Sequence, residues 1–161
     1  MQILGLMVDD KLQFAEHVRA TITACSCSLF ALRTLRSHGL SNKLLRLVFR
    51  SSILSKLTYA SPSFVGFLSN SILDQLQSFI RRAIKFGYYL PSNPEILTVI
   101  NLFESALYRN VVNNPTHVLA PLLPPLKATS YNLRNSTHSL SFPRKDDRNF
   151  INRMVFRNSL H

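Results

Sequence analysis

Tryptophan is absent from this chain of 161 residues, which also has only four glycines and two cysteines. So few glycines leave no glycine-rich loop that could bind the phosphates of a nucleotide. Cys25 and Cys27 lie two residues apart on different faces of a predicted helix, so neither a disulfide nor a metal site is favoured. We expect core cysteines of a protein in a reducing, intracellular compartment, with nuclear and cytoplasmic locations both open.

Long hydrophobic runs are also lacking. No stretch reaches the roughly 20 apolar residues that span a bilayer, and the first residues do not have the basic segment and apolar core of a signal peptide. The sequence therefore predicts no membrane partner. The five histidines are scattered without the spacing of metal ligands, and no serine lies in a nucleophile-elbow sequence. We expect no cofactor bound by this chain.

Acidic residues are much fewer than basic ones: the chain has 8 Asp and Glu against 19 Lys and Arg, which gives a net charge of +11. Between residues 17 and 94, ten basic residues accompany a single acid, Asp74. A solvated surface normally mixes both signs, so this segment predicts a polyanionic partner, with nucleic acid ahead of an anionic membrane. A basic surface that serves only solubility is the alternative.

Apolar residues recur every three or four positions from residue 12 onward, and this period predicts helices. The first helix extends to Gly39, a residue typical of helix C-terminal ends. The second follows Ser41, a suitable N-cap, and the third extends from Ser69 or Ser71 to Gly87. Between the second and third helices, residues 59–67 contain a proline, a glycine and several aromatics, and they predict a packed loop.

The rest of the chain predicts a helix bounded by Pro94 and Pro115, in one piece or two, and then a proline-rich segment. Five of the eight prolines lie within residues 115–148. The predicted fold is therefore mainly α: a several-helix bundle with a short N-terminal β-strand and an extended C-terminal segment that ends in a short helix. We divide it into residues 1–11, 12–113 and 114–161.

Asp9 and Asp10 follow a short apolar strand at residues 2–8, and adjacent acids in that position resemble the Mg²⁺ ligands of a polymerase. Such a site needs a return strand after the acids and a third carboxylate. Here Lys11 follows directly and the apolar period becomes helical. We therefore interpret Asp9 or Asp10 as the N-cap of the first helix, and predict no catalytic or metal-binding residue.

Basic residues cluster on the predicted helices. On the second helix they recur at i, i+3 and i+7, beside its apolar face. Such clusters suit contact with a phosphate backbone without base reading. The alternative is that the arginines cover the core and neutralise helix C-termini, which we expect more for Arg33, Arg36 and Lys85 than for Lys43, Arg46 and Arg50. The predicted nucleic-acid-binding residues are Lys43, Arg46, Arg50, Lys56, Arg81, Arg82, Lys85, Arg33 and Arg36.

Taken in order, several segments resemble one part of the LINE-type (non-LTR) retrotransposon reverse transcriptases, of a jockey- or CR1-like lineage. That part follows the catalytic palm and contains the primer grip and the thumb. Each motif is short, but the ordered set covers nearly the whole chain. The matching residues are Leu4, Gly5, Asp9, Leu12, Phe14, His17, Leu32, Arg33, Leu35, Gly39, Tyr59, Ala60, Ser61, Phe64, Leu76, Arg81, Ile84, Phe150 and Arg153.

The resemblance implies a primer-grip strand at 1–11 and a thumb-like domain at 12–113 that hold an RNA–DNA hybrid or duplex by its backbone. The family's catalytic aspartates and Mg²⁺ lie upstream, in the palm and fingers that would be the missing partner, so this chain alone is expected not to polymerise. Its opening on an apolar strand also indicates a fragment. The alternative is a helical protein-interaction module that binds an acidic partner through four aromatic anchors. These anchors are Phe64, Phe67, Tyr88 and Tyr89.

Overall fold

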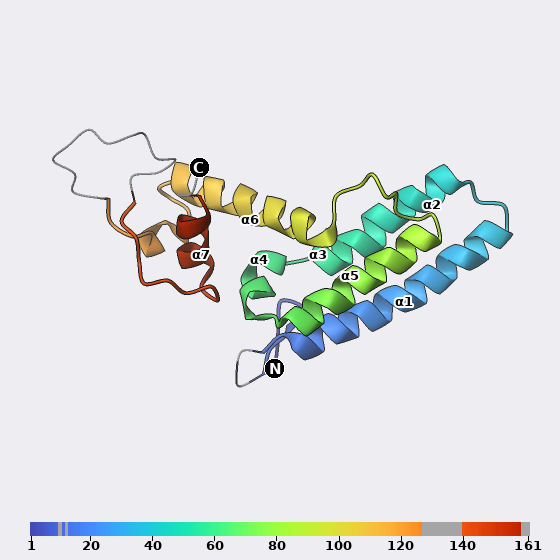
Figure 1. Ribbon diagram of the computed structural model, residues 1–161, viewed down its shortest axis with the longest axis horizontal. Coiled ribbons are helices and arrows are strands. Elements are labelled where there is room, and N and C mark those ends of the chain that lie inside the picture. Colours follow the sequence, from blue (N-terminus) through green and yellow to red (C-terminus); the bar gives the residue numbers. More distant parts are fainter. Residues whose placement is uncertain (10, 12, 127–139, 159–161) are drawn as a thin grey trace. The chain divides into compact units, whose positions relative to one another are not determined.

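The computed structural model describes residues 1–9, 11, 13–126 and 140–158, and its fold is mainly helical, as the sequence predicts (Figure 1). The chain divides into two compact units, Met1–Asn101 (unit 1) and Leu102–His161 (unit 2). The division falls inside helix α6 (Ile96–Asn113), whereas the sequence prediction placed a boundary at the end of that helix. The two units are described separately below.

The N-terminal residues of unit 1 form an antiparallel hairpin of two short strands, β1 (Gln2–Ile3) and β2 (Leu6–Met7). Both turn residues between them have positive φ angles, 47° at Leu4 and 86° at Gly5. Two-residue hairpin turns of type I′ require this conformation, and glycine adopts it without strain. The prediction of one strand over residues 2–8 was therefore wrong, because Gly5 reverses the chain.

Two side chains attach this hairpin to the helices. The Tyr59 hydroxyl donates a hydrogen bond to the Leu4 carbonyl oxygen at 3.1 Å, and the Met7 N–H donates to His17 Nδ1 at 3.4 Å. Only a neutral imidazole can accept through Nδ1, and burial lowers the pKa of His17, which favours the neutral ring. The bond from Met7 is therefore present at neutral pH.

Helix α1 (Ala15–Ser37) begins three residues later than the apolar period predicts, and its N-cap residue is Phe14. Asp9 Oδ1 instead accepts two backbone N–H groups of the turn before the helix, at 3.0 and 2.6 Å. The N-cap interpretation was therefore wrong for Asp9, which stabilises that turn, and Asp10 lies outside the described residues.

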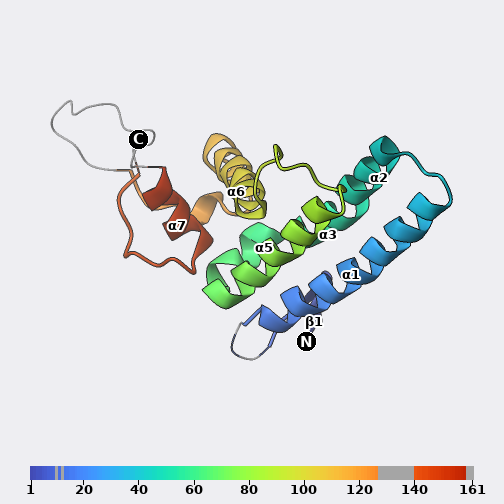
Figure 2. The same cartoon turned by 45° about the vertical axis from the view of Figure 1, so that its right-hand side comes forward.

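Three helical segments build the bundle of unit 1. After α1, one continuous rod consists of α2 (Asn42–Val48), the π-helix η1 (Phe49–Leu54) and α3 (Ser55–Thr58). Ser41 caps this rod, as predicted, by accepting the N–H of the third residue that follows it. The third segment is α5 (Asn70–Lys85), which lies beside α1 and runs in the same direction (Figure 2).

The buried faces of α1 and α5 are those that the apolar period predicts. On the rod, Leu45 and Phe49 are buried as predicted, but the inward placement of Leu44 was wrong, because this side chain is 46% exposed. The rod contributes the ring of Phe49 and the side chain of Ile53, and the Cys25 thiol of α1 lies 3.9 Å from the Ile53 carbonyl oxygen. Burial of each large apolar side chain contributes about 1.5–3 kcal/mol, so this core is the main source of stability. Buried residues on α1 and α5 are Val18, Cys25, Leu29, Leu32, Ile72, Leu76, Phe79, Ile80 and Ala83.

The segment predicted as a packed loop, residues 59–67, is helical instead. Ala60 adopts a left-handed conformation with φ of 51° and ends the rod, after which α4 (Ser61–Phe64) and the 3₁₀ turn η2 (Val65–Phe67) follow. Pro62 lies in the first turn of α4, where no intrahelical partner for its missing N–H is needed. The prediction was wrong because this proline begins a helix rather than ending one.

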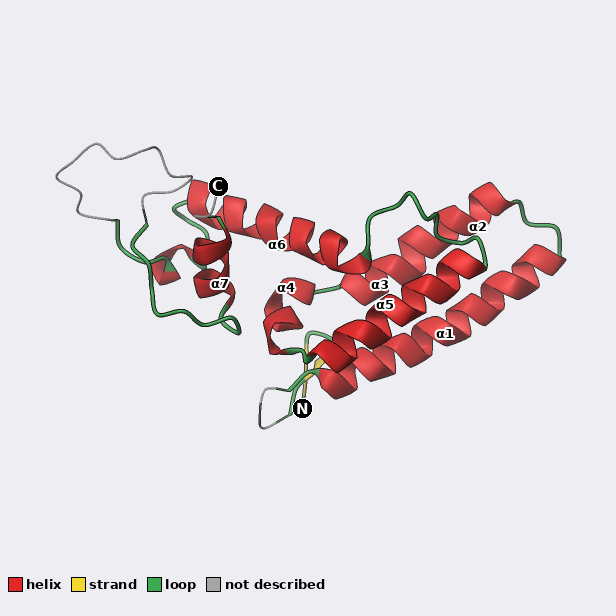
Figure 3. Ribbon diagram, in the orientation of Figure 1, coloured by secondary structure: helices red, strands yellow, loops and turns green. Residues whose placement is uncertain are grey.

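Unit 2 has its own small core, and Figure 3 shows its helices and the loops between them. Its elements are the second part of α6, which is continuous, the 3₁₀ turn η3 (Ala120–Leu122) and α7 (Phe150–Arg157). An isolated bridge pairs Leu126 with Leu140, and residues 127–139 of the predicted extended segment lie outside the described residues. The core residues are Tyr108, Val111, Leu140, Ile151, Met154 and Val155.

A buried carboxylate joins α6 to α7. Glu104 has no exposed surface, and its two oxygens accept hydrogen bonds from Arg153 and from Arg157, the latter at 2.7 Å. The Arg153 guanidinium also donates to the Asp147 carbonyl oxygen at 2.7 Å, which fixes the chain just before α7. Burying a charge is costly unless it is paired in this way.

Replacing Glu104 with glutamine is expected to destabilise unit 2 by about 3 kcal/mol, because Arg153 would keep a buried charge without its partner. Arg157→Gln should cost less, since the Arg157 side chain is 37% exposed. Urea unfolding, monitored by amide hydrogen exchange on α7, measures the change in the free energy of unfolding for both variants. Arg109→Gln, an exposed change on α6, is the matched control, and an equal effect of all three would contradict the buried-pair account.

The two cysteines are expected to differ strongly in reactivity. Cys25 is buried and burial raises the pKa of its thiol to about 11, partly offset by the charge of Lys56, whereas Cys27 is exposed. Since the thiolate is the reactive form, iodoacetamide at pH 8 should modify Cys27 quickly and Cys25 only when the bundle opens. Mass spectrometry of Cys27→Ser and Cys25→Ser variants measures the two rates, and equal rates would contradict this packing.

Candidate nucleic-acid interface

The nine predicted basic residues all lie in unit 1 and come from every segment of its bundle. Eight are exposed, and Arg46 is half-buried. They divide into those that contact other parts of the bundle and those for which the described residues offer no hydrogen bond or ion pair. By segment, they are Arg33 and Arg36 on α1, Lys43 and Arg46 on α2, Arg50 in η1, Lys56 on α3, and Arg81, Arg82 and Lys85 on α5.

The turn that follows α5, residues 86–89 (the 86–89 turn), is the point where several of these arginines meet. Gly87 has φ of 76° and its N–H bonds to the Ile84 carbonyl oxygen, while the next N–H bonds to that of Ala83. This pattern is a Schellman motif, and it ends α5 where the sequence predicts. The hydrogen bonds of this motif do not involve the carbonyl oxygens of Phe86 and Gly87.

Arginines from two other segments occupy those two oxygens. The Arg36 guanidinium donates to the Phe86 carbonyl oxygen at 2.8 Å, and Arg46 Nε donates to the Gly87 carbonyl oxygen at 3.1 Å. Arg36 also lies over the Tyr88 ring, 4.4 Å from its centroid. These contacts connect the end of α5 to α1 and to the rod.

Two further arginines are close to the same turn. Arg33 stacks over the Phe86 ring at 5.7 Å. Burial raises the pKa of Tyr89, and the positive charge of Arg50 offsets part of that rise. Four arginines from α1, α2 and η1 therefore surround the 86–89 turn. The helix end at Gly87 was predicted, but the meeting of arginines from other segments at this turn was not, because it depends on contacts between residues distant in the sequence.

The remaining basic residues differ in their contacts. Arg82 lies over the Phe79 ring at 5.4 Å and reaches the Ser26 hydroxyl at 3.4 Å, so it also bridges α5 and α1. For Lys43, Arg81 and Lys85, the described part of the chain provides neither a hydrogen bond nor an ion pair. A structural role therefore applies to Arg36, as the sequence predicts. It also applies to Arg46, which the sequence places among the residues less suited to such a role.

No acid neutralises these charges within the described residues. The ion pairs there are Arg19 with Glu16 in unit 1, and the two pairs of Glu104 in unit 2. Asp74 lies eleven residues before Lys85 on α5, about 16 Å away along the helix axis. At that distance a solvent-exposed charge is largely screened at physiological salt. The basic surface of unit 1 is therefore uncompensated.

The four aromatic residues considered as exposed anchors are mostly core residues. Phe64, Tyr88 and Tyr89 are only 3%, 1% and 3% exposed, and Phe67 is half-buried. Phe64 packs against Phe14 with ring centroids 5.7 Å apart. Their use as protruding anchors for a protein partner was therefore wrong, because the bundle needs these rings to fill its own interior.

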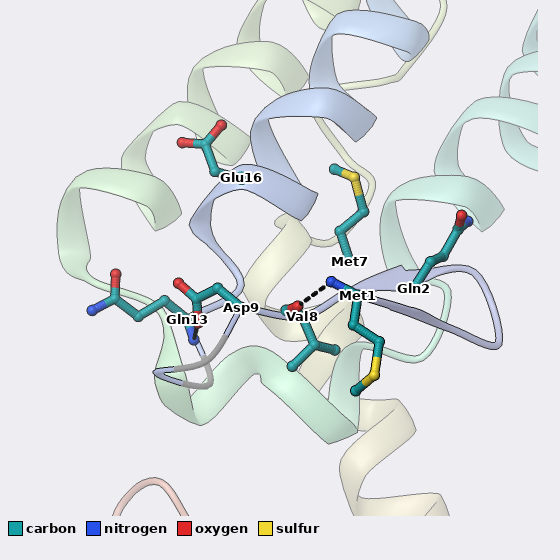
Figure 4. Close-up of a pocket in the computed structure, with 7 residues that line it drawn as sticks. All are labelled: Met1, Gln2, Met7, Val8, Asp9, Gln13 and Glu16. Carbon is teal, nitrogen blue, oxygen red and sulfur yellow. Dashed lines mark hydrogen bonds between the residues drawn. The ribbon is translucent and has the colours of Figure 1, made fainter.

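The acids near the N-terminus line an open pocket of about 370 Å³ together with hairpin residues (Figure 4). Asp9 is engaged by two backbone N–H groups, and Glu16 pairs with Arg19 at 2.6 Å. Within residues 1–9, 11, 13–126 and 140–158, no three His, Cys, Asp or Glu residues form a group that could hold a metal ion. The pocket therefore gives no support to metal-dependent catalysis.

Comparisons of the chain with protein families, curated proteins and solved structures found no match. The resemblance to LINE-type reverse transcriptases therefore stays an expectation based on the motifs. None of the helices that the structure describes is long and apolar enough to cross a membrane. The functional argument depends on the charge and geometry of unit 1.

Arg46→Gln is expected to lower the stability of unit 1 by about 1–2 kcal/mol, because a charged hydrogen bond to a partly buried carbonyl is lost. Lys43→Gln, on the same helix, should change it by less than about 0.5 kcal/mol. Chemical denaturation monitored by circular dichroism measures both. A similar loss in the two variants would show that the bond to Gly87 contributes little.

Proposed function

We propose that unit 1 binds the phosphate backbone of an RNA–DNA hybrid or duplex, as part of a LINE-type reverse transcriptase. The observation that carries this proposal is the group of nine basic residues on one bundle, none of which pairs with an acid within the described residues. Neutralising phosphates releases condensed counterions, which gives such a surface its affinity. A surface kept only for solubility does not require so strong an excess of basic over acidic residues.

The aromatic residues favour backbone contact over base recognition. Proteins that bind single strands stack bases on exposed aromatic rings next to a basic groove. At the 86–89 turn, Tyr88 and Tyr89 are buried and Phe86 is half-buried, while Phe30 and Tyr59 elsewhere in unit 1 are exposed. At this turn the surface is therefore suited to a regular double helix, whose phosphates are presented at fixed spacing, and we expect little sequence preference.

The motif resemblance supports the same role, since the thumb of that family holds the primer–template. Polymerisation itself is assigned to the parent enzyme, whose palm carries the catalytic aspartates and Mg²⁺. Within this chain, Asp9 has no partner carboxylate that completes a metal site among the described residues. We therefore propose a binding role and no catalytic one for this chain.

A basic module for an acidic protein partner is the second candidate, and the same uncompensated charge favours it. Its anchors cannot be the buried rings of Phe64, Tyr88 and Tyr89. A partner held by exposed charges would associate weakly and in a strongly salt-dependent way. A regular polyanion of high charge density is the better fit to nine basic residues spread over the bundle, on which Phe30 and Tyr59 are the aromatic side chains that remain exposed.

The proposal predicts that duplex binding weakens steeply with salt and depends on unit 1. Fluorescence anisotropy with a labelled 20-base-pair RNA–DNA hybrid between 50 and 200 mM salt measures the affinity and its slope. Arg81→Gln with Lys85→Gln should weaken binding and reduce the slope by about 2, since each phosphate contact contributes about 0.9. Arg109→Gln with Lys145→Gln removes the same charge from unit 2 and should have a smaller effect.

Two outcomes would contradict this function. Binding that does not change between the two salt concentrations would exclude counterion release as its source. Equal weakening by the unit 1 and unit 2 pairs would show that only net charge matters. A poly-glutamate competitor distinguishes the second candidate, because it should displace the hybrid at comparable charge concentration only if the surface is adapted to acidic protein.

A further inference from the structure

We infer that Arg36 and Arg46 form a defined phosphate-binding fork at the 86–89 turn, and that this fork is the centre of the backbone contact. The inference rests on the proposed function and makes it more specific. It distinguishes two fixed arginines from the other basic residues, which would contribute only general attraction. Inorganic pyrophosphate serves as a simple probe, because it presents two adjacent phosphate groups, although with more charge than two phosphodiesters.

The first argument is the position of the two guanidinium groups. Each is bound to a main-chain carbonyl, and the two carbonyls belong to consecutive residues, Phe86 and Gly87, whose Cα atoms are about 3.8 Å apart. The guanidinium of Arg36 is further fixed by the Tyr88 ring. Arginines from two different helices are therefore bound to neighbouring main-chain carbonyls before any ligand arrives.

The second argument is the charge balance at this end of the bundle. The C-termini of α1 and α5 each carry about −0.5 of an elementary charge, and the start of α2 carries about +0.5. These partial charges sum to roughly −0.5, whereas five cationic side chains lie near these helix ends. They are Arg33, Arg36, Lys43, Arg46 and Lys85. Neutralising helix ends therefore accounts for only a small part of the charge, and the excess favours an anion.

The third argument concerns the donors that remain. A guanidinium has five N–H donors in a rigid plane, and the described bonds of Arg36 and Arg46 each use one. Arg36 is exposed and Arg46 half-exposed, so unused donors reach solvent. Because the carbonyls already restrict both side chains, a phosphate group bound between them would cost less side-chain entropy than one bound by mobile lysines.

The experiment compares two charge-preserving double variants. Arg36→Lys with Arg46→Lys keeps the charge but removes both planar guanidinium groups, and Arg109→Lys with Arg144→Lys, at two exposed arginines of unit 2, is the matched control. Isothermal titration with pyrophosphate, at ionic strength held constant with sodium chloride, should show at least five-fold weaker binding to the first variant. The control should bind within two-fold of the unmodified protein.

A second measurement avoids any loss of folding in the variants. In the unmodified protein, pyrophosphate should shift the Nε–H resonances of Arg36 and Arg46 more than that of Arg81. Shifts of equal size at all exposed arginines, or equal weakening by the two double variants, would overturn the fork.

The fork and the proposed function fail in different ways. If the hybrid binds but pyrophosphate binding does not depend on Arg36 and Arg46, the fork is wrong and backbone binding remains. If pyrophosphate binds through the fork but the hybrid does not bind at all, the anion site stands and the nucleic-acid function is wrong.

Discussion

The carbonyl oxygens of Phe86 and Gly87 bind the guanidinium groups of Arg36 and Arg46, and the end of unit 1 depends on these two bonds. Since α1 and α5 run in the same direction, their C-terminal carbonyls lie at the same end of the bundle, where no further helical turn can satisfy them. Arginines from the neighbouring segments supply the donors. Three segments that share few backbone hydrogen bonds are thereby connected at one point.

Arginine is suited to this position in a way that lysine is not. One N–H of its planar group can bind a carbonyl while others stay open to an anion. The structural role of Arg36 and Arg46 and a role in phosphate contact are therefore compatible. From the sequence alone, the structural role and the phosphate contact are alternatives, because the sequence does not show that one arginine side chain has donors for both.

The period of apolar residues was enough to predict the helices of unit 1 and the buried face of α5, because burial and periodicity follow from the same geometry. The two glycine-terminated helix ends were predictable for a similar reason. The hairpin turn at Gly5, the helix that begins at Pro62 and the burial of Tyr88 were not, since each depends on contacts with residues distant in the sequence. The arginine contacts with the 86–89 turn depend on such contacts as well.

The motif residues of the resemblance do not all have the same weight. Phe150 and Arg153 match the family, but Arg153 is required by the buried Glu104, so that match reflects packing in unit 2. Within the described residues, no hydrogen bond or ion pair is formed by the side chains of Lys43, Arg50, Lys56, Arg81 and Lys85. Selection for stability gives no reason for these uncompensated cations on one bundle, because like charges repel in the compact state. In the proposed function they supply general attraction to a polyanion, while the fork of Arg36 and Arg46 both stabilises the fold and positions a phosphate.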